Sequence, residues 1–493
     1  VDRSAIETRA QIRVLKKTKL IRSAKSLPRS RFDRGAINDS HPTQRVGLQV
    51  ATSCNRSAKI QRMKFIHAAD LHIDSPLRGL EEYAGAPVER VRNATREALV
   101  RLVDLCLDQQ AAFLIVAGDL FDHDWKDFNT ALFVVKQFQR LDKEGIPVYV
   151  IRGNHDSRAE MSLQVPWPTS GRFKLFSHKQ AETVVLPELG VAIHGMSFAE
   201  RHVRESLLPK YPAPLSGMLN IGILHTSATG ASGIEDHPSY APCTIKELVD
   251  MGYQYWALGH VHQRQILHEG ACRIVYPGNT QGRHIRETGP KGCAVVTVED
   301  GEIENIDFVS TDVLRWKEVE LELSAHHQLD DLYELVATQL KAELVAADER
   351  LLGVRLKIQG GCAAHRQLNS DAARREADAA LRARVGEISD DVWLEKIKWQ
   401  TRPPVDRNVL KEGQDFIGEL LRDVDQLAAD DTQFAAFLAC LQPLIDKTES
   451  DLQAGRDEDD KSEKLIDFES AAQRRDWLKA AEGLLLNQLT KDD

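Results

Sequence analysis

Five short polar motifs follow apolar runs in the first half of the chain, and their residue types are those that bind metal ions or transfer protons. In chain order they contain Asp70 and His72, Asp119, Asn154 and His155, His225, and His260 and His262. A single Asp or His after an apolar run is usually a cap or a satisfied polar residue. Five independent placements are hard to explain by chance, so the pattern predicts one site assembled from several loops.

The mixture of donors in these motifs indicates a catalytic metal centre. Carboxylate oxygen, amide oxygen and imidazole nitrogen together suit Mn, Fe or Zn, and the absence of thiolates argues against a structural zinc site. Two cations about 3.5–4 Å apart need a shared anion, and they can activate a water and neutralise charge on a phosphoryl group in transfer. Asp119 is the candidate for the shared ligand.

Strand and helix patterns alternate around these motifs, as in a layered α/β domain. Apolar strands are expected at Lys64–Ala68, Ala111–Ala117, Pro147–Ile151, Val191–His194, Ile221–Leu224 and Tyr255–Leu258, with amphipathic helices at Val88–Gln109 and Phe128–Lys143. Sheets of this kind carry their active residues in the loops beyond the carboxyl ends of the strands. The polar motifs stand at those positions.

The motifs as a set resemble the signature of the calcineurin-like metallophosphoesterases. The matching strings are DLH from Asp70, GDLFD from Gly118, GNHD from Gly153 and GHVH from Gly259, with an isolated His225. Within that superfamily the chain is similar to the bacterial DNA-repair exonucleases of the SbcD and YhaO group. That similarity is carried by FIHAADLHIDSPLRGL from Phe65, YWALGHVHQRQIL from Tyr255 and IVYPGNTQGRHIRETGPKGC from Ile274, the last two being closest to the YhaO branch. It implies two β-sheets flanked by helices over about residues 63–310.

The resemblance also implies a role for each motif residue. One metal takes Asp70, His72 and His262, the other takes Asn154, His225 and His260, and Asp119 bridges them. His155 is not a ligand in the family; it lies over the scissile phosphate, where an imidazolium can stabilise charge or protonate the leaving oxygen. Asp156 either orients this imidazole or caps its own loop. Mn is the most expected metal, with Fe or Zn as alternatives.

Contacts to the substrate are less clearly marked. Many nuclease members have a second His directly after GDLF, whereas this chain has Asp122 there and His123 one place later. Either His123 takes over the phosphate-positioning role or this branch works without it. Arg283 and His284 lie in a glycine-bounded loop, where they either meet a phosphate backbone or are simply solvated. His194 ends an apolar strand and is expected to be a satisfied polar residue.

Two further regions are predicted to follow the catalytic domain. Residues 311–402 alternate strand, helix, strand, helix, strand, which predicts a small α+β domain, and the resemblance implies that it caps the catalytic domain of residues 63–310 and helps to select the DNA form. Residues 403–493 are predicted to be helical and acidic. Their amphipathic stretches either pack on the chain itself or dock on a partner, which in the family is an SbcC-like coiled-coil ATPase.

Charge is divided unevenly along the chain. Residues 1–62 hold 15 Lys or Arg against 4 Asp or Glu, although the whole chain has a net charge of −10. This basic extension has no hydrophobic periodicity and is expected to be disordered. The favoured interpretation is a start assigned upstream of Met63, and a transit peptide is the alternative. The acidic remainder means that DNA binding must rest on a local basic patch, bound cations or a partner.

Composition also suggests a compartment and a function. The seven cysteines form no CxxC pair, which suits free thiols in a reducing, cytoplasmic environment, and no apolar stretch is long enough for a membrane span. The function that fits best is a two-metal phosphodiesterase acting as a DNA exonuclease in repair. The same metal core could serve a small-molecule or phosphoprotein substrate, and a homodimer is compatible with the sequence.

Overall fold

The computed structural model describes residues 62–75, 87–122, 128–158, 165–231, 239–348, 350–368, 370–404 and 407–441, and residues 478, 479, 481–483, 485, 486 and 489. The predictions for residues 1–61, for His123 and for residues 442–477 lie outside this part of the chain. No helix within it is both long and apolar enough to cross a bilayer.

The first sheet has six strands in the spatial order β14-β13-β1-β2-β3-β4. Its strands are β1 (Met63–Ala68), β2 (Leu114–Ala117), β3 (Val148–Ile151), β4 (Phe173–Leu175), β13 (Gly292–Glu299) and β14 (Glu302–Ser310). The strands from β1 to β4 are parallel, and β13 and β14 add two antiparallel strands beyond β1. The carboxyl ends of β1, β2 and β3 therefore lie at one edge of this sheet.

The second sheet also has six strands, in the order β11-β12-β10-β7-β6-β5. Its strands are β5 (Glu182–Leu186), β6 (Val191–Gly195), β7 (Leu219–His225), β10 (Tyr255–Gly259), β11 (Gln265–Glu269) and β12 (Arg273–Tyr276). The four central strands are parallel, and the edge strands β5 and β11 are antiparallel to their neighbours. A short pair, β8 (Ala228–Thr229) and β9 (Cys243–Thr244), stands apart from both sheets.

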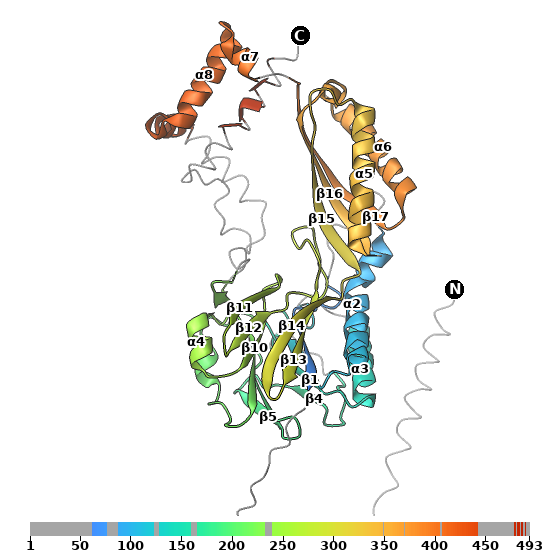
Figure 1. Cartoon of the computed structure of the whole chain (residues 1–493), viewed down its shortest axis with the longest axis vertical. Helices are drawn as coiled ribbons and strands as arrows, with labels where there is room; N and C mark the ends of the chain where they lie inside the picture. Colours follow the sequence, from blue (N-terminus) through green and yellow to red (C-terminus); the bar gives the residue numbers. More distant parts are fainter. Residues whose placement is uncertain are drawn as a thin grey trace, which may run out of the picture. The chain divides into compact units, whose positions relative to one another are not determined.

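Strand β1 shows how the layers form, because its alternate residues enter two different cores. Ile66 and Ala68 pack beneath helices α2 (Val88–Asp108) and α3 (Phe128–Lys143), whereas Phe65 packs between the two sheets. Side chains of a strand alternate between its faces, so a strand with buried apolar residues on both faces must be covered on both. Helix α4 (Ile245–Asp250) covers the outer face of the second sheet. The order is helix, sheet, sheet, helix (Figure 1).

A smaller layer follows β14. Its strands β15 (Leu314–Glu322), β16 (Leu351–Gly361) and β17 (Val392–Arg402) are all parallel, and the helices α5 (Leu329–Ala347) and α6 (Asp371–Ile388) connect them. Both helices lie along this sheet in Figure 1, and their apolar stripes share one core with alternate residues of β16. The strands and helices predicted here are present. Their parallel pairing, which periodicity does not reveal, makes the unit a βαβαβ layer.

The described C-terminal part is helical. It contains α7 (Arg407–Glu412), α8 (Phe416–Ala429) and a helical stretch over residues 431–441. The Arg407 guanidinium pairs with Glu482 and with Asp425 at 2.6 Å, so the last described residues contact this helical region. The layered α/β fold with a helical C-terminal region, predicted from the sequence, is confirmed.

Candidate metal centre

The carboxyl ends of five strands bring the predicted ligands to one place, four through the loops that follow them and one through its last residue. They are the loops after β1 (Asp70, His72), β2 (Asp119), β3 (Asn154, His155) and β10 (His260, His262), and the last residue of β7, His225. Four of these residues have a positive φ: Asp70 at 52°, His72 at 43°, Asp119 at 49° and His260 at 103°. Non-glycine residues rarely adopt this conformation, and a cluster of them marks a functional site.

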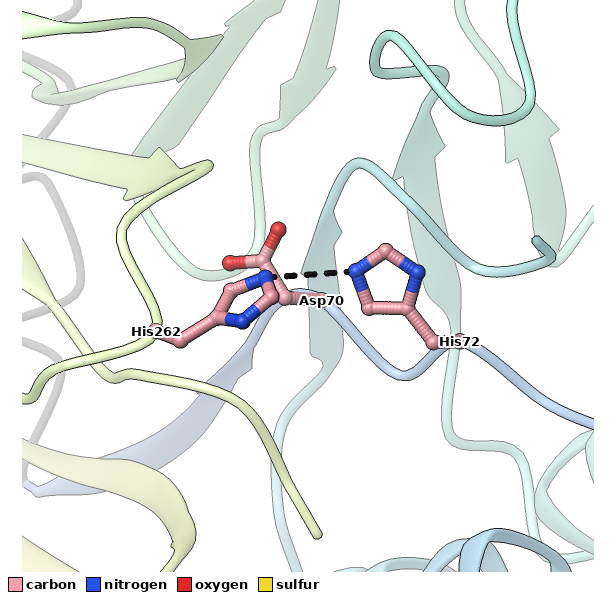
Figure 2. Close-up of side chains that lie close together, drawn as sticks. All are labelled: Asp70, His72 and His262. Carbon is pink, nitrogen blue, oxygen red and sulfur yellow. Dashed lines mark hydrogen bonds between the residues drawn. The ribbon is translucent and has the colours of Figure 1, made fainter. Parts of the chain in front are cut away.

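Asp70, His72 and His262 form the first group of donor atoms (Figure 2). Their ligand atoms lie within 4.8 Å of one another, and Nε2 of His72 is 3.3 Å from Nε2 of His262. Burial, with the Arg283 guanidinium nearby, holds the pKa of His72 well below its usual value, so this ring is neutral. A cation placed among these atoms would satisfy the lone pairs of both rings.

Asp119, Asn154 and His225 form the second group. Nε2 of His225 lies 2.9 Å from Oδ1 of Asn154 and 3.4 Å from Oδ2 of Asp119. Nδ1 of His225 is 3.0 Å from the carbonyl oxygen of Ala117, and this contact fixes the orientation of the ring. Oδ2 of Asp119 also lies 3.8 Å from Nε2 of His72. The Asp119 carboxylate therefore reaches both groups, as a bridging ligand must.

His260 lies beside the second group. Its backbone N–H donates to the two carboxylate oxygens of Asp70 at 3.1 and 3.0 Å, and its ring centroid is 5.3 Å from that of His225. Within the described ranges, three groups of His and Asp side chains lie close enough to hold a metal ion: Asp70 with His72 and His262, Asp70 with Asp119 and His225, and His72 with Asp122 and His155. The role of the His260 ring as a ligand is a proposal.

The charges at the centre fit bound cations. Asp70 and Asp119 are each only 1% exposed. Burial raises the pKa of Asp70 to about 7. Burial also acts to raise the pKa of Asp119, but the neighbouring His225 and His155 outweigh it and hold that pKa well below its usual value. Buried carboxylates need positive charge, and this donor set of O and N atoms suits Mn, Fe or Zn. The predicted ligands would hold two divalent cations, with Asp119 between them.

His155 is held beside the two groups by Asp122. Nδ1 of His155 lies 2.8 Å from Oδ1 of Asp122, and the His155 side chain is 22% exposed. Burial lowers the pKa of His155, but the carboxylates of Asp119 and Asp122 outweigh it and raise that pKa above its usual value. These carboxylates favour the protonated form of His155, and a partly accessible imidazole of this kind can act as a proton donor.

Of the two roles predicted for Asp156, loop capping matches its contacts. Its two oxygens accept backbone N–H groups, from Gly153 at 2.8 Å and from Leu120 at 2.9 Å. These bonds tie the loop after β3 to the loop after β2, which is the alternative, loop-capping role. The carboxylate that contacts the His155 ring is that of Asp122.

A loop between β12 and β13 adds two residues to the site. Glu287, which sequence reasoning missed, accepts a bond from Nδ1 of His262 at 2.7 Å. Arg283 is 16% exposed, and its guanidinium lies 3.3 Å from Oδ2 of Asp122 and 3.6 Å from Oε1 of Glu287. The one sequence signal for Glu287 is that it is the single acid in a basic, glycine-bounded loop.

The remaining candidates lie in different surroundings. The side chain of His284 is 53% exposed, and its Nε2 is 3.6 Å from Glu287, so it borders the site without entering it. His194 is buried, is bonded to Thr183 and Asn220, and stacks on Tyr253, so it is a satisfied structural residue as expected.

Comparison with known proteins identifies two parts of the chain. Residues 63–264 match the family model "Calcineurin-like phosphoesterase", and residues 316–402 match "Metallophosphoesterase YhaO, middle domain". The chain is 35% identical over 277 residues to "Uncharacterized metallophosphoesterase YhaO" of Bacillus subtilis, a match covering 56% of this chain and 66% of that protein.

More distant relatives carry names that concern DNA. "DNA double-strand break repair protein Mre11" of Methanopyrus kandleri is 24% identical, with 58% of this chain and 65% of that protein covered. A nuclease SbcCD subunit of Staphylococcus epidermidis is 25% identical, with 52% and 72% covered. The matches to the first two relatives span less than two thirds of those proteins. Residues 63–264 are therefore a calcineurin-like phosphoesterase domain, and residues 316–402 resemble the middle domain of the metallophosphoesterase YhaO.

Proposed function

We propose that this chain is a phosphodiesterase that uses two divalent cations, most expectedly Mn²⁺, and that its substrate is DNA. The observation that carries the proposal is the placement of His155. The imidazole of His155, fixed by Asp122 and with its pKa raised by the neighbouring carboxylates, stands beside two groups of buried donor atoms that share Asp119. This combination would supply cation ligands for the phosphoryl oxygens and the attacking water, and a proton donor for the leaving oxygen.

Each residue then has a defined task. Bound cations would supply an activated water and would neutralise charge on the phosphoryl oxygens. Asp119 accepts the backbone N–H of His155 at 2.9 Å, so the same carboxylate also positions the acid. His155 as imidazolium stabilises the developing charge and protonates the leaving 3′ or 5′ oxygen. The Arg283 guanidinium, which faces Asp122, contacts a non-bridging oxygen of the phosphate.

Three observations favour DNA over a smaller substrate. Two of the relatives are named as a DNA repair protein and as a nuclease. The chain adds the β15–β17 layer and a helical region to the phosphoesterase core, and these additions suit a polymer and a partner. Arg283 places one cationic group at the site in an otherwise acidic chain. The proposal extends to DNA repair in the cytoplasm with an SbcC-like coiled-coil ATPase as the partner.

A nuclease assay on end-labelled linear DNA tests the proposal. The purified chain is incubated with Mn²⁺, with Mg²⁺ or with a chelator, and bis(4-nitrophenyl) phosphate is assayed in parallel. His155→Ala removes the proton donor, and His326→Ala, which changes an exposed histidine of the small layer, is the matched control. We expect Mn²⁺-dependent shortening of DNA by the parent and the control, and none by His155→Ala.

Assays on the two substrates distinguish a wrong choice of substrate from a wrong choice of reaction. Hydrolysis of the aryl phosphodiester without cleavage of DNA would contradict the DNA proposal and favour a small-molecule or phosphoprotein substrate. Activity toward neither substrate in a chain that has taken up Mn²⁺ would contradict the phosphodiesterase proposal itself. Full activity of His155→Ala would remove that residue from the reaction.

A further inference from the structure

The carboxylate of Glu287 links the metal centre to the loop between β12 and β13. It accepts bonds from Nδ1 of His262 at 2.7 Å, from the side-chain amide of Asn279 at 2.9 Å and from the backbone N–H of Arg283 at 2.7 Å. A proton held on Nδ1 leaves Nε2 as the free donor atom, so Glu287 sets both the tautomer and the orientation of His262. Any contact that fixes Glu287 therefore acts on a predicted ligand.

The first strand of the small layer, β15, holds this loop at two points. The indole N–H of Trp316 donates to the carbonyl oxygen of Gly282 at 3.0 Å, and the backbone N–H of Gly289 donates to the carbonyl oxygen of Trp316 at 3.1 Å. The Gln281 side chain adds a bond to the carbonyl oxygen of Leu314 at 2.6 Å. Glu287 lies between the two points that Trp316 holds.

The indole of Trp316 is closely confined, and two glycines make this possible. A β-carbon at Gly282 would lie 3.0 Å from the indole, and one at Gly353, which stands opposite Trp316 in the register of β15 and β16, would lie 2.9 Å from it. Trp316 is 4% exposed and belongs to the apolar core that joins helix α2 to the small layer. A ring confined in this way holds its N–H in one direction.

We propose that Trp316 is a positioning residue for the metal centre, acting through Gly282 and Glu287 on His262. The proposal rests on the proposed function, because it requires that His262 bind a cation. In this proposal, strand β15 supports the metal site. A shift of the small layer that broke the hydrogen bond from Trp316 to Gly282 would weaken cation binding.

Calorimetric titration of the metal-free full chain with Mn²⁺ tests this inference. Trp316→Phe keeps an aromatic ring and removes the N–H. Trp399→Phe is the matched control, because the Trp399 indole donates to Asp378 at 2.7 Å in the same layer, away from the loop. We expect about tenfold weaker binding at one of two Mn²⁺ sites in Trp316→Phe, as for other residues that orient a ligand, and parental affinity in Trp399→Phe.

A double-mutant cycle shows whether the effect passes through Glu287. Glu287→Gln alone should weaken the same site about tenfold, and adding Trp316→Phe should change it less than about twofold further. Independent effects in the cycle, or equal Mn²⁺ affinities of Trp316→Phe and Trp399→Phe, would overturn the inference. If Trp316→Phe does not fold, Gln281→Met removes the neighbouring attachment and is expected to give the same loss.

The outcomes for the inference and for the proposed function are distinct. A parent chain that binds two Mn²⁺ ions and is matched by Trp316→Phe would overturn only the role of Trp316. A parent chain that binds no Mn²⁺ would overturn the metal-dependent function, and the inference with it.

Discussion

The Asp119 carboxylate combines two tasks that are usually separate. It reaches donor atoms of both groups, through His72 and His225, and it also accepts the backbone N–H of His155. Loss of this one side chain would therefore remove the shared ligand and release the loop that carries the acid. In the proposed reaction His155, by contrast, would contribute only its ring.

These different tasks predict different metal contents for two inactive variants. Asp119→Ala should lose Mn²⁺ on dialysis, because its two buried donor groups then lack their common anion. His155→Ala should retain two Mn²⁺ ions per chain and still fall by about 10²-fold or more in hydrolysis. Metal analysis after dialysis, together with the aryl phosphodiester assay, checks both. Equal metal content in the two variants would contradict the assignment.

The pairing of His155 with Asp122 predicts a pH effect. The proposed acid works when protonated, so activity is present below the pKa of His155 and is lost as pH rises through it. Asp122 is one of the carboxylates that raise this pKa, so Asp122→Asn should move the alkaline fall of kcat/KM to lower pH, by about one unit or more.

Ser75→Ala is the control for this pH effect, since it removes a bond of 2.8 Å to the same carboxylate without removing its charge. Its pH–rate profile should largely follow that of the parent. An unchanged alkaline limb in Asp122→Asn would show that another group donates the proton.

At the scale of the elements, the two sheets meet directly at the site. A β-carbon on Gly259, the last residue of β10, would lie 1.9 Å from the carbonyl oxygen of Ala117 in β2 and 2.9 Å from Nδ1 of His225. The backbone of β10 therefore needs a residue without a side chain here. The Ala117 carbonyl that it approaches is the one that orients the His225 ring.

Two alanine substitutions should accordingly change stability in opposite directions. Gly259→Ala should lower the free energy of unfolding by about 2 kcal/mol or more, because the clash is with backbone and cannot be relieved by a side-chain rotation. Gly386→Ala in helix α6, where nothing lies within 4 Å, should raise it by about 0.5–1 kcal/mol. Urea unfolding of both variants tests this. A Gly259→Ala chain as stable as the parent would contradict the close approach.

The sequence predicts which segments form elements better than it predicts how they pair. Asp70 and Asp119 each follow a short apolar run, and the helix that begins at Val88 has an amphipathic pattern. Local pattern alone therefore locates all three. Pairing depends on residues far apart, as when Met63 of β1 lies opposite Val298 of β13. No local pattern contains that register, and none contains the parallel order of β15, β16 and β17.

The same distinction applies to contacts within the site. Asp156 attracts attention because it adjoins His155, yet Asp122 makes the contact from the loop after a different strand. Glu287 orients His262 from a loop beyond the last motif, and an isolated Glu has no signature. Asp122 stands in the GDLFD motif and Glu287 in none of the motifs, but for neither does the sequence show which histidine it contacts. These partners are recognised only when the fold brings them together.

At the scale of the whole chain, positive charge is concentrated in residues 1–62, away in sequence from the residues of the proposed active site. The net charge is −10 although residues 1–62 are strongly basic, so the part that holds the site is acidic. Affinity for DNA rises with the number of phosphates neutralised, and its salt dependence measures that number. An acidic chain must obtain much of the positive charge at its active site from bound cations, with Arg283 as a local addition.

Binding of DNA by the non-cleaving His155→Ala chain should therefore have two separable components. One, due to residues 1–62, should need no metal and should fall steeply with salt. The other should require Mn²⁺, disappear in a chelator and depend on salt with a log–log slope of only a few units, because few protein cations contribute. Fluorescence anisotropy of labelled DNA over a range of about 50 to 300 mM KCl would measure both. A chain that begins at Met63 should keep only the second component. Steep, chelator-resistant binding by that shorter chain would instead show a basic DNA surface on the folded part, and the cations would then serve the reaction alone.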